Sequence, residues 1–142
     1  MSVSITTNLS EVLAGMTAFN AKFDQAVLFG NRMVALKVER QAVRNADTGH
    51  HGRGEGHIPG TGPGPNTMST SLKQSIRAED RSGFGNYEIV VGATVEYARA
   101  VEEGSPKWKS GVKYPYMRPA AEMIRPQAAR TFVEAMTSRL RG

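Results

Sequence analysis

The stretch that decides the fold is NLSEVLAGMTAFNAKFDQAVLFGNRMVALKVERQAVRN, residues 8–45. Its apolar residues recur at steps of three and four, which places them along one stripe of a helix with 3.6 residues per turn. Asn8 or Ser10 can supply the N-cap, because a short polar side chain accepts hydrogen bonds from the first free backbone N–H groups. We therefore predict one long helix, or two abutting helices, over residues 8–45. The stripe consists of Val12, Met16, Phe19, Phe23, Ala26, Val27, Val34 and Val38.

Three apolar residues of this helix fall off the stripe. Phe29 and Leu36 lie seven residues apart and share one flank, and Leu28 points nearly opposite to the stripe. A helix with apolar residues on two sides usually contacts two surfaces. The second surface is either more of the same domain or a neighbouring subunit, and the sequence does not choose between them. Gly15 and Gly30 weaken the helix locally and indicate bends or close packing.

The character of the sequence changes after the helix. Residues 46–69 contain seven glycines and three prolines. Glycine disfavours regular structure entropically, and proline removes a backbone donor, so this segment forms neither a helix nor a central strand. We predict a long loop of the kind that is functional or orders against a partner.

A β-hairpin is predicted next. Residues 72–78 alternate weakly between apolar and polar, which suits a strand, and residues 87–91 alternate more clearly, with Tyr87, Ile89 and Val91 on one face. Residues 81–86 carry two glycines and form the expected turn between the strands. The two strands are expected to pair antiparallel.

Two helices are predicted in the remainder. Residues 95–103 form a short helix with Thr94 as its N-cap and Gly104 as its stop. Residues 118–140 form the last helix, with Pro119 in its first turn and Pro126 expected to kink or divide it. The fold class is therefore α+β, and 142 residues suit a single domain spanning 1–142.

Composition excludes several classes of protein. The chain has no cysteine, which rules out disulfides and Cys-based zinc sites. We find no secretory signal and no apolar stretch long enough to span a membrane, so we expect synthesis in the cytoplasm and no membrane partner. The net charge is +5, and residues 105–142 hold eight Lys or Arg against two acids. This asymmetry indicates a solvated basic face, an acidic partner or nucleic acid.

No constellation of residues points to catalysis, a metal or a cofactor. The three histidines, His50, His51 and His57, all lie in the Gly/Pro-rich segment, where rigid metal ligation is not expected. The acidic pairs Glu79-Asp80 and Glu102-Glu103 are adjacent in sequence, whereas acid–base catalysis needs carboxylates that face each other across a substrate. We therefore expect no enzyme and no cofactor.

Nucleic-acid binding remains an alternative. Lys107-Trp-Lys109 places an aromatic ring between two cations, and Tyr114 and Tyr116 follow. Stacking on aromatic rings combined with phosphate contacts would use such a set. A small basic nucleic-acid-binding protein is accordingly the second hypothesis for function.

Three segments in fixed order carry a resemblance to a known family. They are STSLKQSI at 69–76, VGATVEYARAVEEGS at 91–105 and YPYMRPA at 114–120. Together they resemble the small tail-component proteins of long-tailed bacteriophages, which show a Tyr-Ala-x-x-Val-Glu-x-Gly segment followed by a Pro-aromatic-aliphatic-x-Pro-Ala segment. The likeness covers residues 72–142, with a looser match through the first helix. Glu103 departs from it, since the family usually has an apolar residue there.

The resemblance implies a structural virion protein rather than an enzyme. It would be a neck or tail-completion subunit that forms a homo-oligomeric ring, a hexamer by analogy with tail symmetry, between head-closure proteins and tail-terminator or tail-tube proteins. The ring would assemble in the host cytoplasm and reside at the head–tail junction of the virion, with DNA passing through its lumen.

Two groups of residues are singled out on this basis. Candidates for intersubunit contact are Phe29, Leu36, His57 and Ile58. Residues of the family motifs are expected to shape packing, and they are Leu72, Ile76, Tyr97, Ala98, Val101, Gly104, Pro115 and Pro119.

Overall fold

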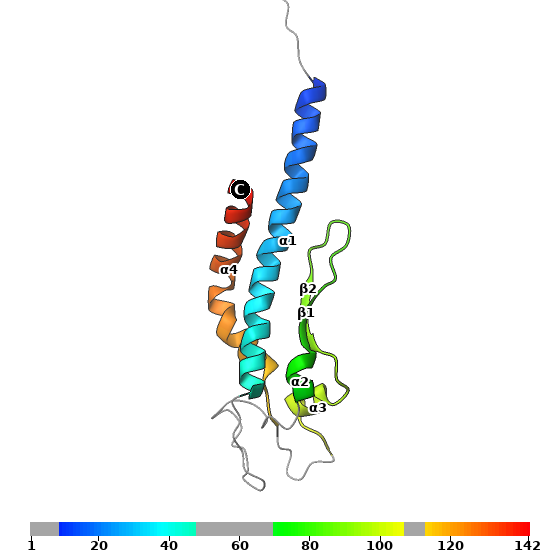
Figure 1. Cartoon of the computed structure of the whole chain (residues 1–142), viewed down its shortest axis with the longest axis vertical. Helices are drawn as coiled ribbons and strands as arrows, with labels where there is room; N and C mark the ends of the chain where they lie inside the picture. The colour runs from blue at the N-terminus through cyan, green and yellow to red at the C-terminus, as the bar shows by residue number, and fades with distance from the viewer. Residues whose placement is uncertain (1–8, 48–69, 107–112) are drawn as a thin grey trace, which may run out of the picture.

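A computed structural model describes residues 9–47, 70–106 and 113–142 of the chain. Its elements follow the order α1 (Leu9–Asp47), α2 (Thr70–Ser75), β1 (Ile76–Asp80), β2 (Ile89–Ala93), α3 (Ala98–Glu103) and α4 (Met117–Arg141). The long helix α1 runs through the centre, with α4 along one side and the β-hairpin along the other (Figure 1). This arrangement confirms the predicted α+β class with a long first helix, a small antiparallel sheet, a short helix and a terminal helix. The Gly/Pro-rich segment lies outside the described residues.

Helix α1 forms as predicted, in one piece of 39 residues. A helix of this length measures about 58 Å, at 1.5 Å per residue. Its packed part presents small side chains to its neighbours, because Ala26, Ala35, Ala42 and Ala46 are all buried. Small residues let neighbouring elements approach the helix axis closely, so the core forms around the C-terminal half of α1.

Helix α4 packs antiparallel along that half. Asn45 near the end of α1 donates to the carbonyl of Tyr116 at the start of α4, at 2.9 Å. Further along, Lys37 Nζ donates to Oγ1 of the buried Thr131 at 2.8 Å. Gly30 lies against Phe132, and a Cβ atom at position 30 would stand only 2.7 Å from the ring. Close packing, one of the two roles expected of Gly30, is therefore the one it serves.

The sheet has two antiparallel strands, paired from Ile76 opposite Ala93 to Asp80 opposite Ile89. Hydrogen bonds anchor the hairpin to α1, among them one that the hydroxyl of Tyr87 donates to Asp24 at 2.5 Å. Glu39 accepts from the backbone N–H of Ala78 at 2.7 Å, and Asn31 donates to the carbonyl of Tyr87 at 2.8 Å. The hairpin is thus held lengthwise against α1, and its turn reaches toward the N-terminal half of that helix (Figure 1).

Three local predictions were wrong. The second strand, expected over residues 87–91, lies two residues later, at Ile89–Ala93. Residues 72–75, expected as the start of a strand, belong to α2, and the strand begins only at Ile76. Leu72 and Ile76 are four residues apart, a spacing that suits a helical turn as well as alternation, and both are buried in the same cluster. Helix α3 begins at Ala98 instead of at residue 95 and has no side-chain cap. Thr94 instead donates its backbone N–H to the carbonyl of Ser75, which extends the hairpin.

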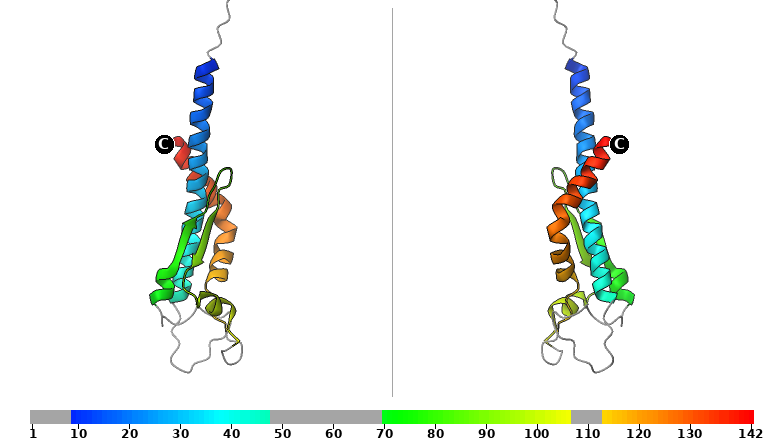
Figure 2. Two further views of the ribbon diagram at one scale, coloured as in Figure 1. Left: turned by 90° about the vertical axis from the view of Figure 1, so that its right-hand side faces the viewer. Right: turned by 90° about the vertical axis from the view of Figure 1, so that its left-hand side faces the viewer.

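The stop signals and the last helix agree better with expectation. Gly104 ends α3 with a φ of 87°, a conformation that side chains other than glycine rarely adopt. Helix α4 spans Pro126 without being divided. Its axis changes direction along its length, as the side views show (Figure 2).

Candidate interaction surface

The N-terminal part of α1 extends beyond both of its neighbours (Figure 1). We call residues 10–23 the overhang; every residue from Ser10 to Gln25 is exposed. A stripe of large apolar side chains runs along the overhang. Val12, Met16 and Phe19 are 56%, 59% and 61% exposed, and Phe23 is 41% exposed. Contiguous exposed apolar patches that are large mark interaction sites in many proteins.

The spacing of the stripe is that of a helix–helix seam. Val12, Met16, Phe19 and Phe23 follow one another at steps of four, three and four, the a/d pattern of a heptad. The rings of Phe19 and Phe23 stack on each other with centroids 6.2 Å apart. Among residues 10–23 the only charges are Glu11 and Lys22, which cancel. A surface that is apolar, periodic and uncharged is suited to another apolar surface rather than to water.

The overhang also has little stability of its own as an isolated helix. It contains Gly15, Thr17 and Asn20, which are poor helix formers. Isolated helices of its length are marginal in water, and most helical stability in proteins comes from packing an amphipathic face. A partner that covers the stripe would supply that packing.

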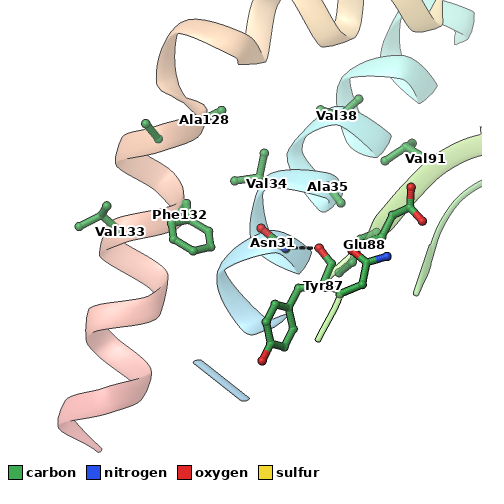
Figure 3. Close-up of a pocket in the computed structure, with 13 residues that line it drawn as sticks. Asn31, Val34, Ala35, Val38, Tyr87, Glu88, Val91, Ala128, Phe132 and Val133 are labelled. Atoms are coloured by element: carbon green, nitrogen blue, oxygen red, sulfur yellow. Dashed lines mark hydrogen bonds between the residues drawn. The ribbon is translucent and has the colours of Figure 1, made fainter. Parts of the chain in front are cut away.

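A second apolar surface lies on the body of the molecule. A groove of about 660 Å³ runs between α4 and β2, with α1 as its floor (Figure 3). The floor is formed by Val34 and Val38, and one wall by Phe132 and Val133 of α4. Val133 is 53% exposed at the rim. The opposite wall comes from the hairpin, and the lining residues there are Asn86, Tyr87, Glu88, Ile89 and Val91.

Glu102 performs a structural task at the other end of the molecule. Its carboxylate accepts hydrogen bonds from the backbone N–H groups of Tyr116, Met117 and Arg118, at 2.7, 2.9 and 2.8 Å. Such donors at the start of a helix have no partner within the helix, and the helix dipole there also favours a negative charge. Glu102 therefore caps α4 from α3, across the segment whose residues 107–112 are outside the described part.

The neighbouring Glu103 points elsewhere. It forms an exposed ion pair with Arg99 at 2.8 Å, one helical turn away. This pairing lowers the pKa of the Glu103 carboxyl, chiefly through the hydrogen bond from Arg99. The two glutamates thus serve separate partners, and no facing pair of carboxylates is formed at this position.

Tyr116 lies at the same junction. It is almost fully buried in the main cluster, with 2% of its surface exposed. Burial raises the pKa of its hydroxyl to about 12, and the charge of Glu102 contributes to the shift. The side chain is therefore neutral at ordinary pH, and its ring packs between α1, α3 and the start of α4.

The predicted intersubunit residues are placed as follows. Phe29 is 37% exposed, and the guanidinium of Arg139 lies 5.8 Å from the centre of its ring. Leu36 is half-buried. The structure brings neither residue into the overhang or the groove. His57 and Ile58 lie outside the described residues, as do His50 and His51.

The motif residues fall into two sets. Four are buried in the main cluster, namely Leu72, Ile76, Ala98 and Val101. The other four are not fully buried: Tyr97 is 40% exposed and precedes α3, Gly104 is half-buried at its end, and Pro115 and Pro119 are half-buried on either side of the start of α4. Sequence reasoning missed Glu102 as the cap of α4, although this residue belongs to the second of the resembling segments.

Sequence reasoning also missed the overhang as a surface. The heptad spacing and the scarcity of charge over residues 10–23 are visible in the sequence. Periodicity alone assigns these residues to the main packing face of the helix, because nothing in the sequence shows where the neighbouring elements end.

Other kinds of site find no support in the described residues. Among them, no group of three or more His, Asp or Glu side chains could hold a metal ion. None of the helices in that part of the chain is long and apolar enough to cross a membrane. No family model, no curated protein and no solved structure matches the chain.

Proposed function

We propose that the chain is a structural subunit of the head–tail junction of a tailed bacteriophage, acting in a homo-oligomeric ring. The observation that supports a subunit role is the overhang, whose apolar stripe is exposed over about 17 Å of helix. A stable monomer gains nothing from such a surface, and in water it favours aggregation. In an assembly the same stripe becomes buried and contributes to association.

The assignment to a phage particle is supported by the three sequence segments that resemble the tail-component family. In this chain they meet at one place, the junction of α2, α3 and the start of α4. Leu72, Ile76 and Val101 belong to one cluster there, and Glu102 of the second segment caps the helix that the third segment opens. The resembling residues therefore act together in the fold.

Native mass spectrometry of the full chain tests the subunit role. We expect a closed oligomer, and a hexamer would agree with the ring that the resemblance implies. A monomer at every soluble concentration would argue against the proposal.

The phage role has a separate test. In the phage or prophage that encodes the chain, deleting its coding sequence should yield filled heads and tails that do not join, as seen by electron microscopy. Complementation by the wild-type chain should restore joined particles. Normal particles without the chain would contradict the proposal.

Nucleic-acid binding is the alternative, and salt dependence separates it from the subunit role. A binder that neutralises several phosphates loses affinity steeply as salt rises. The described cations give it limited support. In α4, Arg130 is paired with Glu134 at 2.7 Å, and Arg139 lies over Phe29.

A further inference from the structure

We infer that the overhang of one copy seats in the groove between β2 and α4 of the next copy. This inference rests on the proposed function and names the contact that would build the ring. It joins the two exposed apolar surfaces described above, which lie at different levels along α1 (Figures 1 and 3).

The two surfaces match in chemistry. The stripe presents Met16, Phe19 and Phe23, and the groove offers the valines of α1 together with Phe132 and Val133 of α4. Burying such side chains removes apolar surface from water, which is the dominant favourable term in most protein association. Amphipathic helices commonly bind by laying an apolar face into a groove of this kind.

The groove is long enough for part of the stripe. The stripe extends from Val12 to Phe23, about 17 Å of helix at 1.5 Å per residue. The floor of the groove extends from Asn31 to Val38, about 10 Å. The groove therefore accommodates two of the three turns of the stripe, enough for two large side chains of the incoming helix.

Charge favours a second copy as the occupant. Copies of a chain with a net charge of +5 repel one another, and the repulsion is weakest where the surfaces in contact carry little charge. The overhang is neutral over residues 10–23, and the groove is lined by a single charged residue, Glu88. Contact between these two surfaces brings together parts of two basic molecules that carry little charge.

The contact is continuous with packing already present within the chain. The stripe of the overhang leads along α1 to Gly30, which lies directly under Phe132 of α4. Arg139 of α4 lies over the ring of Phe29, at the level where the covered part of α1 ends. In the assembly, a neighbour would extend over residues 10–23 the cover that α4 provides lower on the helix.

This geometry makes the contact head-to-tail. Each copy offers one overhang and one groove, and the two surfaces differ, so the contact is heterologous. Contacts of this type form a ring when the rotation from copy to copy closes, and the proposed function requires that closure. A pairing of overhang with overhang would instead satisfy two copies and leave both grooves uncovered.

Cysteine crosslinking tests the inference directly, because the natural chain has no cysteine. Met16→Cys marks the stripe and Val133→Cys marks the rim of the groove. When the two full-length variants are mixed and treated with a short bis-maleimide, they should give a crosslinked heterodimer. The double variant should give a ladder that ends at the copy number of the ring. Ala21→Cys, exposed on the side of the overhang opposite to the stripe, is the matched control and should not crosslink to Val133→Cys.

A second measurement does not depend on crosslinking chemistry. Phe19→Asp should weaken self-association by at least about tenfold in sedimentation experiments, since exposed aromatic anchors dominate such contacts. Ala21→Asp should leave association near the wild-type value. Both variants should keep the thermal midpoint that the wild-type chain shows at low protein concentration, because the overhang lies outside the core.

The failures of this inference and of the proposed function are distinguishable. Crosslinking of Met16→Cys to itself would overturn groove docking and leave an oligomeric subunit. A closed oligomer with no crosslink between positions 16 and 133 would likewise overturn only the docking. A wild-type chain that stays monomeric at every soluble concentration would overturn both.

Discussion

The two parts of helix α1 share one apolar periodicity, but one part is covered by other elements and the other is exposed to solvent. From Ala26 onward the helix is covered by α4 and the hairpin, and it presents alanines and Gly30 to them. Over residues 10–23 it presents a valine, a leucine, a methionine and two phenylalanines to solvent. The apolar side chains that α1 buries are therefore small, and those that the overhang exposes are large. Small residues suit close contact with a fixed neighbour, whereas large protruding ones suit insertion into a partner.

The largest effect is expected from truncating a core residue and an overhang residue in parallel. Ile76 is fully buried, so Ile76→Ala should lower the free energy of unfolding by about 2–5 kcal/mol. Phe19→Ala removes a larger side chain yet should change the stability of the monomer by less than about 0.5 kcal/mol. Urea unfolding at low protein concentration measures both. Equal losses would mean that the overhang packs within its own chain.

The two adjacent glutamates extend the comparison to α3. Glu102→Ala should cost about 2 kcal/mol, because three backbone donors at the start of α4 lose their acceptor. Glu103→Ala, which removes only an exposed ion pair, should leave the thermal midpoint nearly unchanged. If both variants unfolded at the same temperature, Glu102 would not be acting as a cap.

The two glycines of α1 should respond with opposite signs. Gly30→Ala forces Phe132 to move, a strain of about 1–3 kcal/mol that outweighs the roughly 1 kcal/mol gained in helix propensity. A methyl group at position 15 would meet no atom within 4 Å, so Gly15→Ala should increase helicity without strain. Circular dichroism at 222 nm and thermal midpoints report both. A stabilising Gly30→Ala would contradict the close approach of α4.

Tyr116→Phe should change the free energy of unfolding least of all these variants at neutral pH, but it should alter how that free energy depends on pH above pH 10. The pKa of Tyr116 is about 12 in the folded chain against 10 for the free side chain, so folding favours the protonated form. The contribution of the protonated Tyr116 hydroxyl to folding stability is complete below pH 10 and is lost as pH rises toward 12. Wild-type stability should therefore fall across that window more steeply than that of the variant. If the stabilities of wild type and variant fell in parallel between pH 10 and 12, the Tyr116 hydroxyl would not be buried in the folded chain.

Most of the elements could be predicted from the sequence, and the errors have local causes. The apolar period of residues 8–45 predicts α1, and Gly104 correctly predicts the end of α3. The boundary between α2 and β1 could not be predicted, because the spacing of Leu72 and Ile76 fits both structures. The cap of α4 was missed because Glu102 lies 14 residues before Tyr116, beyond the reach of local capping rules.

What the sequence alone determined is the direction in which each side chain of α1 points. A period of 3.6 residues fixes angles around the helix axis, and it placed Val12, Phe19 and Val38 on one stripe. Only the tertiary structure decided which part of that stripe is covered. The cover depends on how far α4 and the hairpin extend along α1, and both extend past Ala26 but leave residues 10–23 in solvent. Periodicity carries no information about the length of a neighbouring element, so the exposed overhang became visible only in the folded chain.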